Sequence, residues 1–395
     1  MVPASRRAPP VASLRDIQMI PVDLTTLLVV VGMVVSLIAG EAAFHGDTLT
    51  LHINVAPKIA DAGFSGTAAD QIFVAESARI VQGESIIPTP TLRVNSRPTV
   101  ISALATPLQL DSVVGALQDQ LGYDRLVVNA IVLPGTGTGT ALRMLLVVER
   151  PRRAPEQIEV IQADGEPAAL IRRGANVTME RVSPYRVAQA HYVKGLDGDP
   201  EALKEAKQTA AQYLARPWEA DMASERAMLH NLLALLSLLD GQVPEAERQL
   251  KIVDPIPGVL PEARGVVALN RAFLAVAGKR PAEALAFFQA GKKQAAGISL
   301  PDFAARITLL GGLVAWSGGD MVQAEELFRE AIATLPGTQG PHIYLAQLLA
   351  AKGDESGAET ERNAAAAADP FDTQIPVFAQ SIVWVDPANG GIKRR

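Results

Sequence analysis

The chain has 395 residues, a net charge of −6 and 48% hydrophobic residues, which allows two or three domains with buried cores. It contains no cysteine, so disulfides, cysteine-ligated metal centres and cysteine nucleophiles are excluded. The acidic balance argues against nucleic-acid binding, because no basic excess is present to displace counterions from phosphates.

A charge-free apolar run near the N-terminus predicts a transmembrane helix. Residues 24–40 reach the short end of the length that spans a bilayer, about 17–25 residues, and apolar neighbours extend the segment to 19–44. Arginines precede this segment and acidic residues follow it, so the positive-inside rule places residues 1–18 in the cytoplasm. We expect a single-pass anchor in the inner (plasma) membrane, with all later domains extracytoplasmic, in the periplasm if the protein is bacterial. A cleaved signal peptide and a buried helix of a soluble cytoplasmic protein are the alternatives.

Three small residues recur every four positions within this segment. Gly32, Ser36 and Gly40 would share one face of the helix, where a second membrane helix could approach closely. A homodimer through this face is one interpretation. The other, which we prefer, is that glycine is simply common in membrane helices.

Residues 49–173 carry mixed patterns that predict a small α+β domain. Apolar and polar residues alternate over 49–55, as in a half-buried strand, and a helical pattern covers 68–81. Two β-rich runs at 126–133 and 141–149 flank a glycine-rich loop and predict a hairpin. The other elements that we expect are an edge strand or loop in 84–97, a strand at 100–106, a helix at 111–121, and a pair of short strands at 157–162 and 168–172.

No motif in the chain predicts catalysis. The glycine-rich loop at 135–139 leads into a strand and lacks the lysine of a phosphate-binding loop, so we interpret it as a flexible hairpin loop. His45, Asp47 and His52 lie close in sequence, but His52 fits the exposed face of a strand. Ser65 stands in a broken approximation of a nucleophile elbow. We expect no enzyme activity, no cofactor and no metal.

The C-terminal half contains a repeat of 34 residues. Gly319, Ala324, Ala331 and Pro336 recur at Gly353, Ala358, Ala365 and Pro370, and Gly312 recurs as Ala346. The turn glycines would take a left-handed conformation, the small residues would let paired helices approach closely, and the prolines would follow the second helix. Looser units surround Gly241 and Gly278, and in the second of these the alanine, Ala284, comes one residue late.

This pattern resembles the tetratricopeptide repeat family, whose units are helix–turn–helix modules of 34 residues. The resemblance is specific over 302–370 and looser before Ala234. With an opening pair at 185–214, we expect about five helix pairs over 180–370, followed by a tail at 371–395. The predicted fold is therefore mixed: a single transmembrane helix, a small α+β domain and an all-α, tetratricopeptide-like solenoid. A generic α-solenoid is the alternative.

The resemblance implies binding through a concave groove lined by the first helix of each pair. Only Asn231 and Arg306 partly match the carboxylate-clamping residues of the family, so the mostly apolar lining favours an amphipathic helix or an extended apolar segment as ligand. Packing between repeats is the alternative role for the same side chains. Counted back from the turn glycines, the groove positions are Met228, Asn231, Leu235, Ala268, Ala272, Arg306, Leu309, Leu313, Trp316, Ile343 and Gln347.

The leading functional hypothesis is a membrane-anchored scaffold or adaptor that binds a protein or peptide partner on the extracytoplasmic side, in cell-envelope assembly or signalling. The alternative is an envelope hydrolase or ligand sensor with its site in the α+β domain and the repeats as a docking arm.

Overall fold

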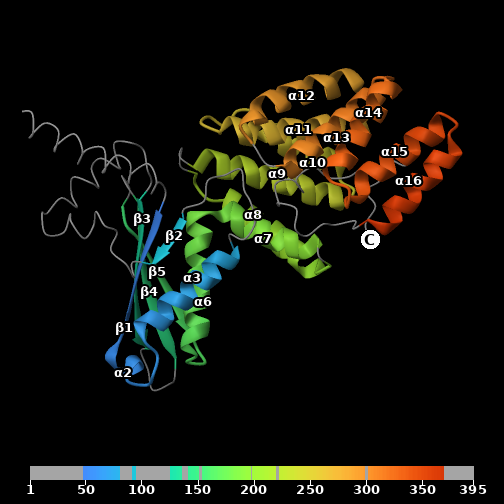
Figure 1. Cartoon of the computed structure of the whole chain (residues 1–395). Helices are drawn as coiled ribbons and strands as arrows, with labels where there is room; N and C mark the ends of the chain where they lie inside the picture. The colour runs from blue at the N-terminus through green and yellow to red at the C-terminus, as the bar shows by residue number, and fades with distance from the viewer. Residues whose placement is uncertain are drawn as a thin grey trace, which may run out of the picture. The chain divides into compact units, whose positions relative to one another are not determined.

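The computed structural model describes residues 48–80, 91–94, 125–135, 141–150, 154–196, 198–218, 222–298 and 301–368 (Figure 1). The predicted anchor at 19–44, the strand at 100–106, the helix at 111–121 and the tail at 371–395 lie outside these residues. Within the described ranges, no helix combines the length and the apolar character that a membrane span requires. The chain divides into two compact units, and the elements below belong to the unit made of Leu49–Asn95 and Leu126–Arg395.

The N-terminal part of this unit is a sheet of five described strands in the order β2-β1-β3-β4-β5. The predicted hairpin is confirmed: β3 and β4 are antiparallel, with Val128 opposite Val148 and Pro134 opposite Leu142. β4 also pairs antiparallel with β5. The strand bounds are β1 Thr48–Val55, β2 Thr91–Val94, β3 Arg125–Pro134, β4 Leu142–Glu149 and β5 Glu156–Gln162.

One face of the sheet is buried beneath two helices, α3 (Gly66–Ile80) and α6 (Pro167–Val182), as Figure 1 shows. Alternate strand residues point into this layer because successive side chains of a strand face opposite ways, which is why β4 alternates buried and half-buried positions. Gly174 lets α6 approach the sheet, since a Cβ there would lie 2.5 Å from the sulfur of Met144. A short helix, α2 (Pro57–Ala60), follows β1.

The prediction of a strand at 168–172 is wrong, because these residues form the first turns of α6. Pro167 stands at the start of the helix, where its fixed φ suits the helix and its missing N–H costs nothing. The Glu166 carboxylate accepts a hydrogen bond from the backbone N–H of Ala168 at 3.3 Å. The buried residues then follow a helical spacing, and α6 continues past residue 173.

Five helix pairs follow in the described part of the chain, which confirms the expected run of paired helices (Figure 1). One continuous apolar cluster extends from Tyr185 to Ala358 through all of them. Proline opens several of these helices, as is common at the first helical position. The pairs are α7 (Pro184–Leu196) with α8 (Pro200–Leu214), α9 (Ala223–Leu239) with α10 (Val243–Ile252), α11 (Pro261–Ala277) with α12 (Pro281–Gln294), α13 (Pro301–Ser317) with α14 (Met321–Thr334), and α15 (Gln339–Ala351) with α16 (Glu355–Ala367).

The turns within the last four pairs share one geometry. Gly319 and Gly353 have the expected left-handed conformation, with φ of 90° and 85°, and Gly241 has φ of 72°. In the third pair Gly278 has φ of −80°, and the left-handed residue is Lys279, with φ of 55°. The interpretation of Gly278 as the turn residue is therefore wrong. Counted from the left-handed residue, a fully buried alanine stands at the same place in each pair: Ala246, Ala284, Ala324 and Ala358.

Candidate binding groove on the paired helices

Most of the side chains predicted to line a groove are buried in the core. Met228 is 0% exposed and Leu235 and Leu309 are each 1% exposed, so no ligand can reach them in this structure. Arg306 is 5% exposed. These side chains pack between helices, which is the alternative role, because neighbouring helices cover them. The buried set is Met228, Asn231, Leu235, Ala272, Arg306, Leu309 and Leu313.

The buried polar members of this set form contacts within the core. The side-chain amide of Asn270 donates a hydrogen bond to Oδ1 of Asn231 at 2.7 Å, which joins α11 to α9. Burial and the nearby Tyr185 raise the pKa of Tyr192, and Arg306 on α13 counteracts this effect in part. Asn231 and Arg306 therefore occupy the interior of the helix stack and not a ligand-accessible clamp.

Three of the predicted residues that remain half-exposed, Trp316, Ile343 and Gln347, meet in one pocket of about 960 Å³. Trp316 comes from α13, and the other two come from α15. We call this pocket the Trp316 groove. Its further lining includes Val276, Leu313, Ala350 and Ala365, from the first helices of three pairs and from α16. The charged side chains among its described lining residues are both cationic, Lys279 and Arg362.

The indole of Trp316 is fixed against the core. Its ring meets that of Phe328 edge to face, with centroids 6.3 Å apart and planes at 79°. Phe328 is fully buried and stacks in turn on Tyr344 at 6.1 Å. Such aromatic pairs contribute about 0.5–1.5 kcal/mol beyond the area that they bury. Trp316 therefore presents a rigid apolar surface to the groove at a small cost in side-chain entropy.

Sequence reasoning missed a second pocket of about 940 Å³ between α12, α13 and α14, which we call the Ile307 groove. Ile307 and Gly311 of α13 line it together with Leu285 of α12, which is 48% exposed. Its charged lining residues have both signs: Lys292 is cationic, and Asp320 and Glu330 are anionic. No signal in the sequence marks this pocket, because α12 carries Leu285, Phe287 and Phe288 together and only the structure shows which of them is exposed.

A buried carboxylate lies where α6, α7 and α9 meet, and sequence reasoning did not identify it. Glu225 accepts hydrogen bonds from Oγ of Ser183 at 2.6 Å and from the backbone N–H of Tyr185 at 2.8 Å. Burial raises the pKa of Glu225 to about 7, although these hydrogen bonds and nearby arginines act in the opposite direction. On α7, Arg186 donates to Gln189 at 2.8 Å, and Gln189 donates to Oη of Tyr185 at 3.1 Å.

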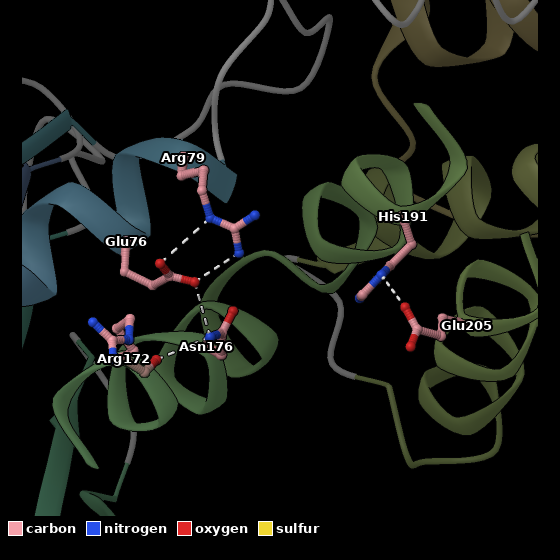
Figure 2. Close-up of polar contacts among 6 residues, drawn as sticks. All are labelled: Glu76, Arg79, Arg172, Asn176, His191 and Glu205. Atoms are coloured by element: carbon pink, nitrogen blue, oxygen red, sulfur yellow. Dashed lines mark hydrogen bonds and ion pairs between the residues drawn. The ribbon is translucent and has the colours of Figure 1, made fainter. Parts of the chain in front are cut away.

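A polar cluster joins α3 to α6 among the described residues of the α+β part (Figure 2). Oε1 of Glu76 on α3 accepts hydrogen bonds from Nη2 of Arg79 at 2.7 Å and from Nδ2 of Asn176 on α6 at 3.1 Å. Burial by itself would raise the pKa of Glu76, but the hydrogen bonds from Arg79 and Asn176 outweigh it and the pKa is lowered. The carboxylate is therefore ionised, and the hydrogen bond that it accepts from Asn176 joins α3 to α6.

Of the residues considered for chemistry, His45 and Asp47 lie outside the described residues and His52 is exposed. The other described histidines and Ser65 have structural partners. His230 contacts Gln249 at 2.8 Å, His342 contacts Glu361 at 2.6 Å, and His191 pairs with Glu205 at 3.0 Å (Figure 2). Oγ of Ser65 accepts a hydrogen bond from Ala68 at the start of α3, as a helix cap. Across the described ranges, no three metal-ligating side chains come together.

No family model and no curated protein matches the chain. Among solved structures, the crystal structure of BtubC (BKLC) from P. vanneervenii matches with 18% identity and a TM-score of 0.34, covering 50% of this chain and 80% of that chain. A TM-score this low does not establish a common fold.

Proposed function

We propose that the protein is a membrane-anchored scaffold or adaptor of the tetratricopeptide repeat type, which binds a protein or peptide partner on the extracytoplasmic side in cell-envelope assembly or signalling. The observation that carries the proposal is the Trp316 groove, in which a fixed, half-exposed indole and Ile343 lie together on the first helices of successive pairs. The buried alanines that follow each left-handed turn residue support the repeat assignment.

The chemistry of the groove favours an extended or helical segment with apolar anchors. Trp316, Ile343 and Val276 offer apolar surface, while the side-chain amide of Gln339 is engaged by the backbone oxygen of Ala365 at 3.0 Å. Large aromatic side chains at the centre of an apolar patch commonly dominate binding energy. Arg362 at the groove is paired with Glu355 at 3.3 Å and Glu359 at 2.7 Å, so Lys279 is the lining residue that would favour an acidic side chain on the partner.

Site-specific photo-crosslinking in the full-length chain tests the partner proposal. A photoreactive residue at position 343 should capture a defined partner in membranes, and Ala350→Glu, which adds a charge to the same groove, should reduce that capture at least about tenfold. The matched control places the photoreactive residue at Ile307, which is also a half-buried isoleucine on a first helix but faces the Ile307 groove. Equal capture from both positions, or capture that is insensitive to Ala350→Glu, would refute the proposal.

The membrane topology needs a separate experiment. Reporter fusions after Phe44 and after Arg395 that are active only outside the cytoplasm would support the anchor at 19–44 with the positive-inside orientation. Activity only in the cytoplasm would overturn the extracytoplasmic placement, while the peptide-binding proposal for the groove would stand unaffected.

The second candidate function, a ligand sensor or hydrolase in the α+β part, is favoured by one observation, the Glu76 cluster. Arg79 is 65% exposed in its side chain while it holds Glu76, so its guanidinium could exchange that partner for an anionic ligand. Arg79→Gln should then abolish ligand-dependent signalling without affecting capture from position 343. Unchanged signalling in Arg79→Gln would remove this candidate.

A further inference from the structure

The Ile307 groove is long enough to hold a helix. Along α13 its lining runs from Ala304 to Gly318, and residues of α12 and α14 complete it. At about 1.5 Å per residue, this stretch of α13 is roughly 21 Å long. α12 contains 14 residues and has about the same length. The groove therefore matches in length one of the helices that line it.

The exposed part of α12 carries no charge over more than two turns. Between Glu283 and Lys292 the helix has no charged residue, although Leu285 is 48% exposed and Ala286 and Gln289 are exposed as well. An exposed apolar patch with a polar rim marks a surface that another protein chain covers. α12 therefore has the character of a helix that is buried in an assembly.

The groove and the uncharged part of α12 belong to one patch, because Leu285 and Gln289 also line the groove. A patch that carries both an exposed helix and a groove of the same length is complementary to a second copy of itself. Two-fold symmetric dimers have this property, since the same patch of both subunits forms the interface. Twenty described residues line the groove, which reaches the about 20–30 residues that each partner contributes to a stable interface.

Two charged side chains of the groove support the same occupant. Lys292 on α12 and Glu330 on α14 are both exposed, and neither side chain takes part in an ion pair or a hydrogen bond within the described ranges. Asp320, which also lines the groove, is already engaged, because it accepts a hydrogen bond from the backbone N–H of Gln323 at 3.0 Å. Opposite charges on one patch are complementary to a second copy, in which each Lys292 can meet the Glu330 of the other.

We propose that two copies of this chain associate through the Ile307 groove, with α12 of each copy seated in the groove of the other and Lys292 paired with Glu330 across the interface. The inference goes beyond the proposed function and does not rest on it. Among the described lining residues, the two grooves share only Pro281, so Trp316 and Ile343 stay outside this interface. The dimer therefore presents two Trp316 grooves, and a partner that carries the recognised segment twice gains avidity.

Crosslinking between two differently tagged full-length chains tests the contact directly. The native chain contains no cysteine, so one chain carries Leu285→Cys, the other carries Ile307→Cys, and a short bis-maleimide joins them. A product with both tags should form efficiently. The matched control replaces Ile307→Cys by Ile343→Cys, a half-buried isoleucine of the Trp316 groove, and should give at least about tenfold less of this product. Equal yields from the two combinations would overturn the proposal.

Charge reversal tests the pairing of Lys292 with Glu330. Energy transfer between dye-labelled full-length chains measures the dissociation constant of self-association. Lys292→Glu and Glu330→Lys should each associate at least about tenfold more weakly, because like charges then face each other twice in the dimer. An equal mixture of the two variants should recover the affinity of the unaltered chain, since both contacts of the mixed dimer again join opposite charges. A mixture as weak as the separate variants, or self-association that neither reversal weakens, would refute the proposal.

The outcome is distinguishable from that of the proposed function. A photoreactive residue at position 307 should capture a second copy of this chain and give a product of twice the chain's mass, whereas capture from position 343 gives the external partner. Loss of every self-association signal with partner capture from position 343 intact would refute the dimer and leave the proposed function standing.

Discussion

Lys279 has a left-handed backbone conformation and stands five residues before Ala284. Gly319 has the same conformation and stands five residues before Ala324. Both alanines are fully buried. The third helix pair therefore keeps the same geometry from turn to buried alanine as the fourth pair, and only the residue type at the turn differs. Because a Cβ is strained at φ of 55°, this lysine is held there by the packing of the two helices that it connects.

Lys279→Gly should stabilise the protein by about 1 kcal/mol, because glycine adopts the left-handed conformation without strain. Its side chain is exposed, so the substitution disturbs no core packing. Urea unfolding followed by circular dichroism measures the effect as a higher midpoint. The matched control is Gly319→Ala, which introduces a Cβ at φ of 90° and should destabilise by a similar amount. A lower midpoint for Lys279→Gly would contradict the strain argument.

Stability should fall as pH rises through the pKa of Glu225. This pKa is raised from 4.5 to about 7 by burial, so the folded protein binds more protons than the unfolded chain between these values. The stabilising effect is complete below about pH 4.5 and is lost as pH rises through 7. Glu225→Gln cannot ionise, so its free energy of unfolding relative to the unaltered protein should increase by up to about 3 kcal/mol between pH 5 and pH 8.

Thermal unfolding of both proteins at several pH values checks this dependence. The matched control is Glu330→Gln, which changes an exposed carboxylate on α14 and should leave the pH dependence of the unaltered protein in place. If the difference in stability between Glu225→Gln and the unaltered protein stays constant from pH 5 to pH 8, Glu225 does not titrate in this range.

Gly312→Ala should destabilise the protein although alanine is the better helix former. A Cβ at position 312 would lie 2.5 Å from Cε1 of Phe328, and overpacking of this kind costs about 1–3 kcal/mol. The equivalent residue in the next pair is Ala346, and the residue there that corresponds to Phe328 is Arg362. The steric conflict is thus specific to the ring of Phe328.

A protein that already carries Phe328→Val tests that explanation, because the effect of Gly312→Ala on the free energy of unfolding should change sign there. In a Phe328→Val protein the ring is gone, so Gly312→Ala should stabilise by up to about 1 kcal/mol through helix propensity and partial filling of the space. The free energies of unfolding of the four proteins form a double-mutant cycle. Additive effects would show that Gly312 and Phe328 do not interact.

The helix pairs were predictable because their determinants are local. Proline at helix starts, glycine at the turns around Gly319 and Gly353, and small residues at fixed offsets all act within one pair. The strand predicted at 168–172 failed because a short apolar run fits either a strand or a helix, and the cap formed by Glu166 with Pro167 decides for the helix.

Exposure of the groove residues could not be predicted from the sequence. Positions such as Leu309 and Trp316 lie on the same helix, and whether a side chain lines a groove or fills the core depends on how closely the helices of other pairs approach. The distance between these helices depends on many contacts between residues that are far apart in the sequence. Only the structure separates Leu309, which is 1% exposed, from Trp316, which lines the groove.

Replacing one residue of the buried pair Asn231 and Asn270 should lower the free energy of unfolding more than replacing both. Asn270 and Asn231 are 2% and 1% exposed and share a hydrogen bond of 2.7 Å. Asn270→Leu leaves the carbonyl oxygen of Asn231 buried without this donor, which costs about 1–3 kcal/mol. Asn231→Leu/Asn270→Leu removes both polar groups and should recover most of that loss. Urea unfolding of the two single variants and the double variant measures the coupling, and a double variant as unstable as the sum of the two singles would show that the pair contributes nothing as a pair.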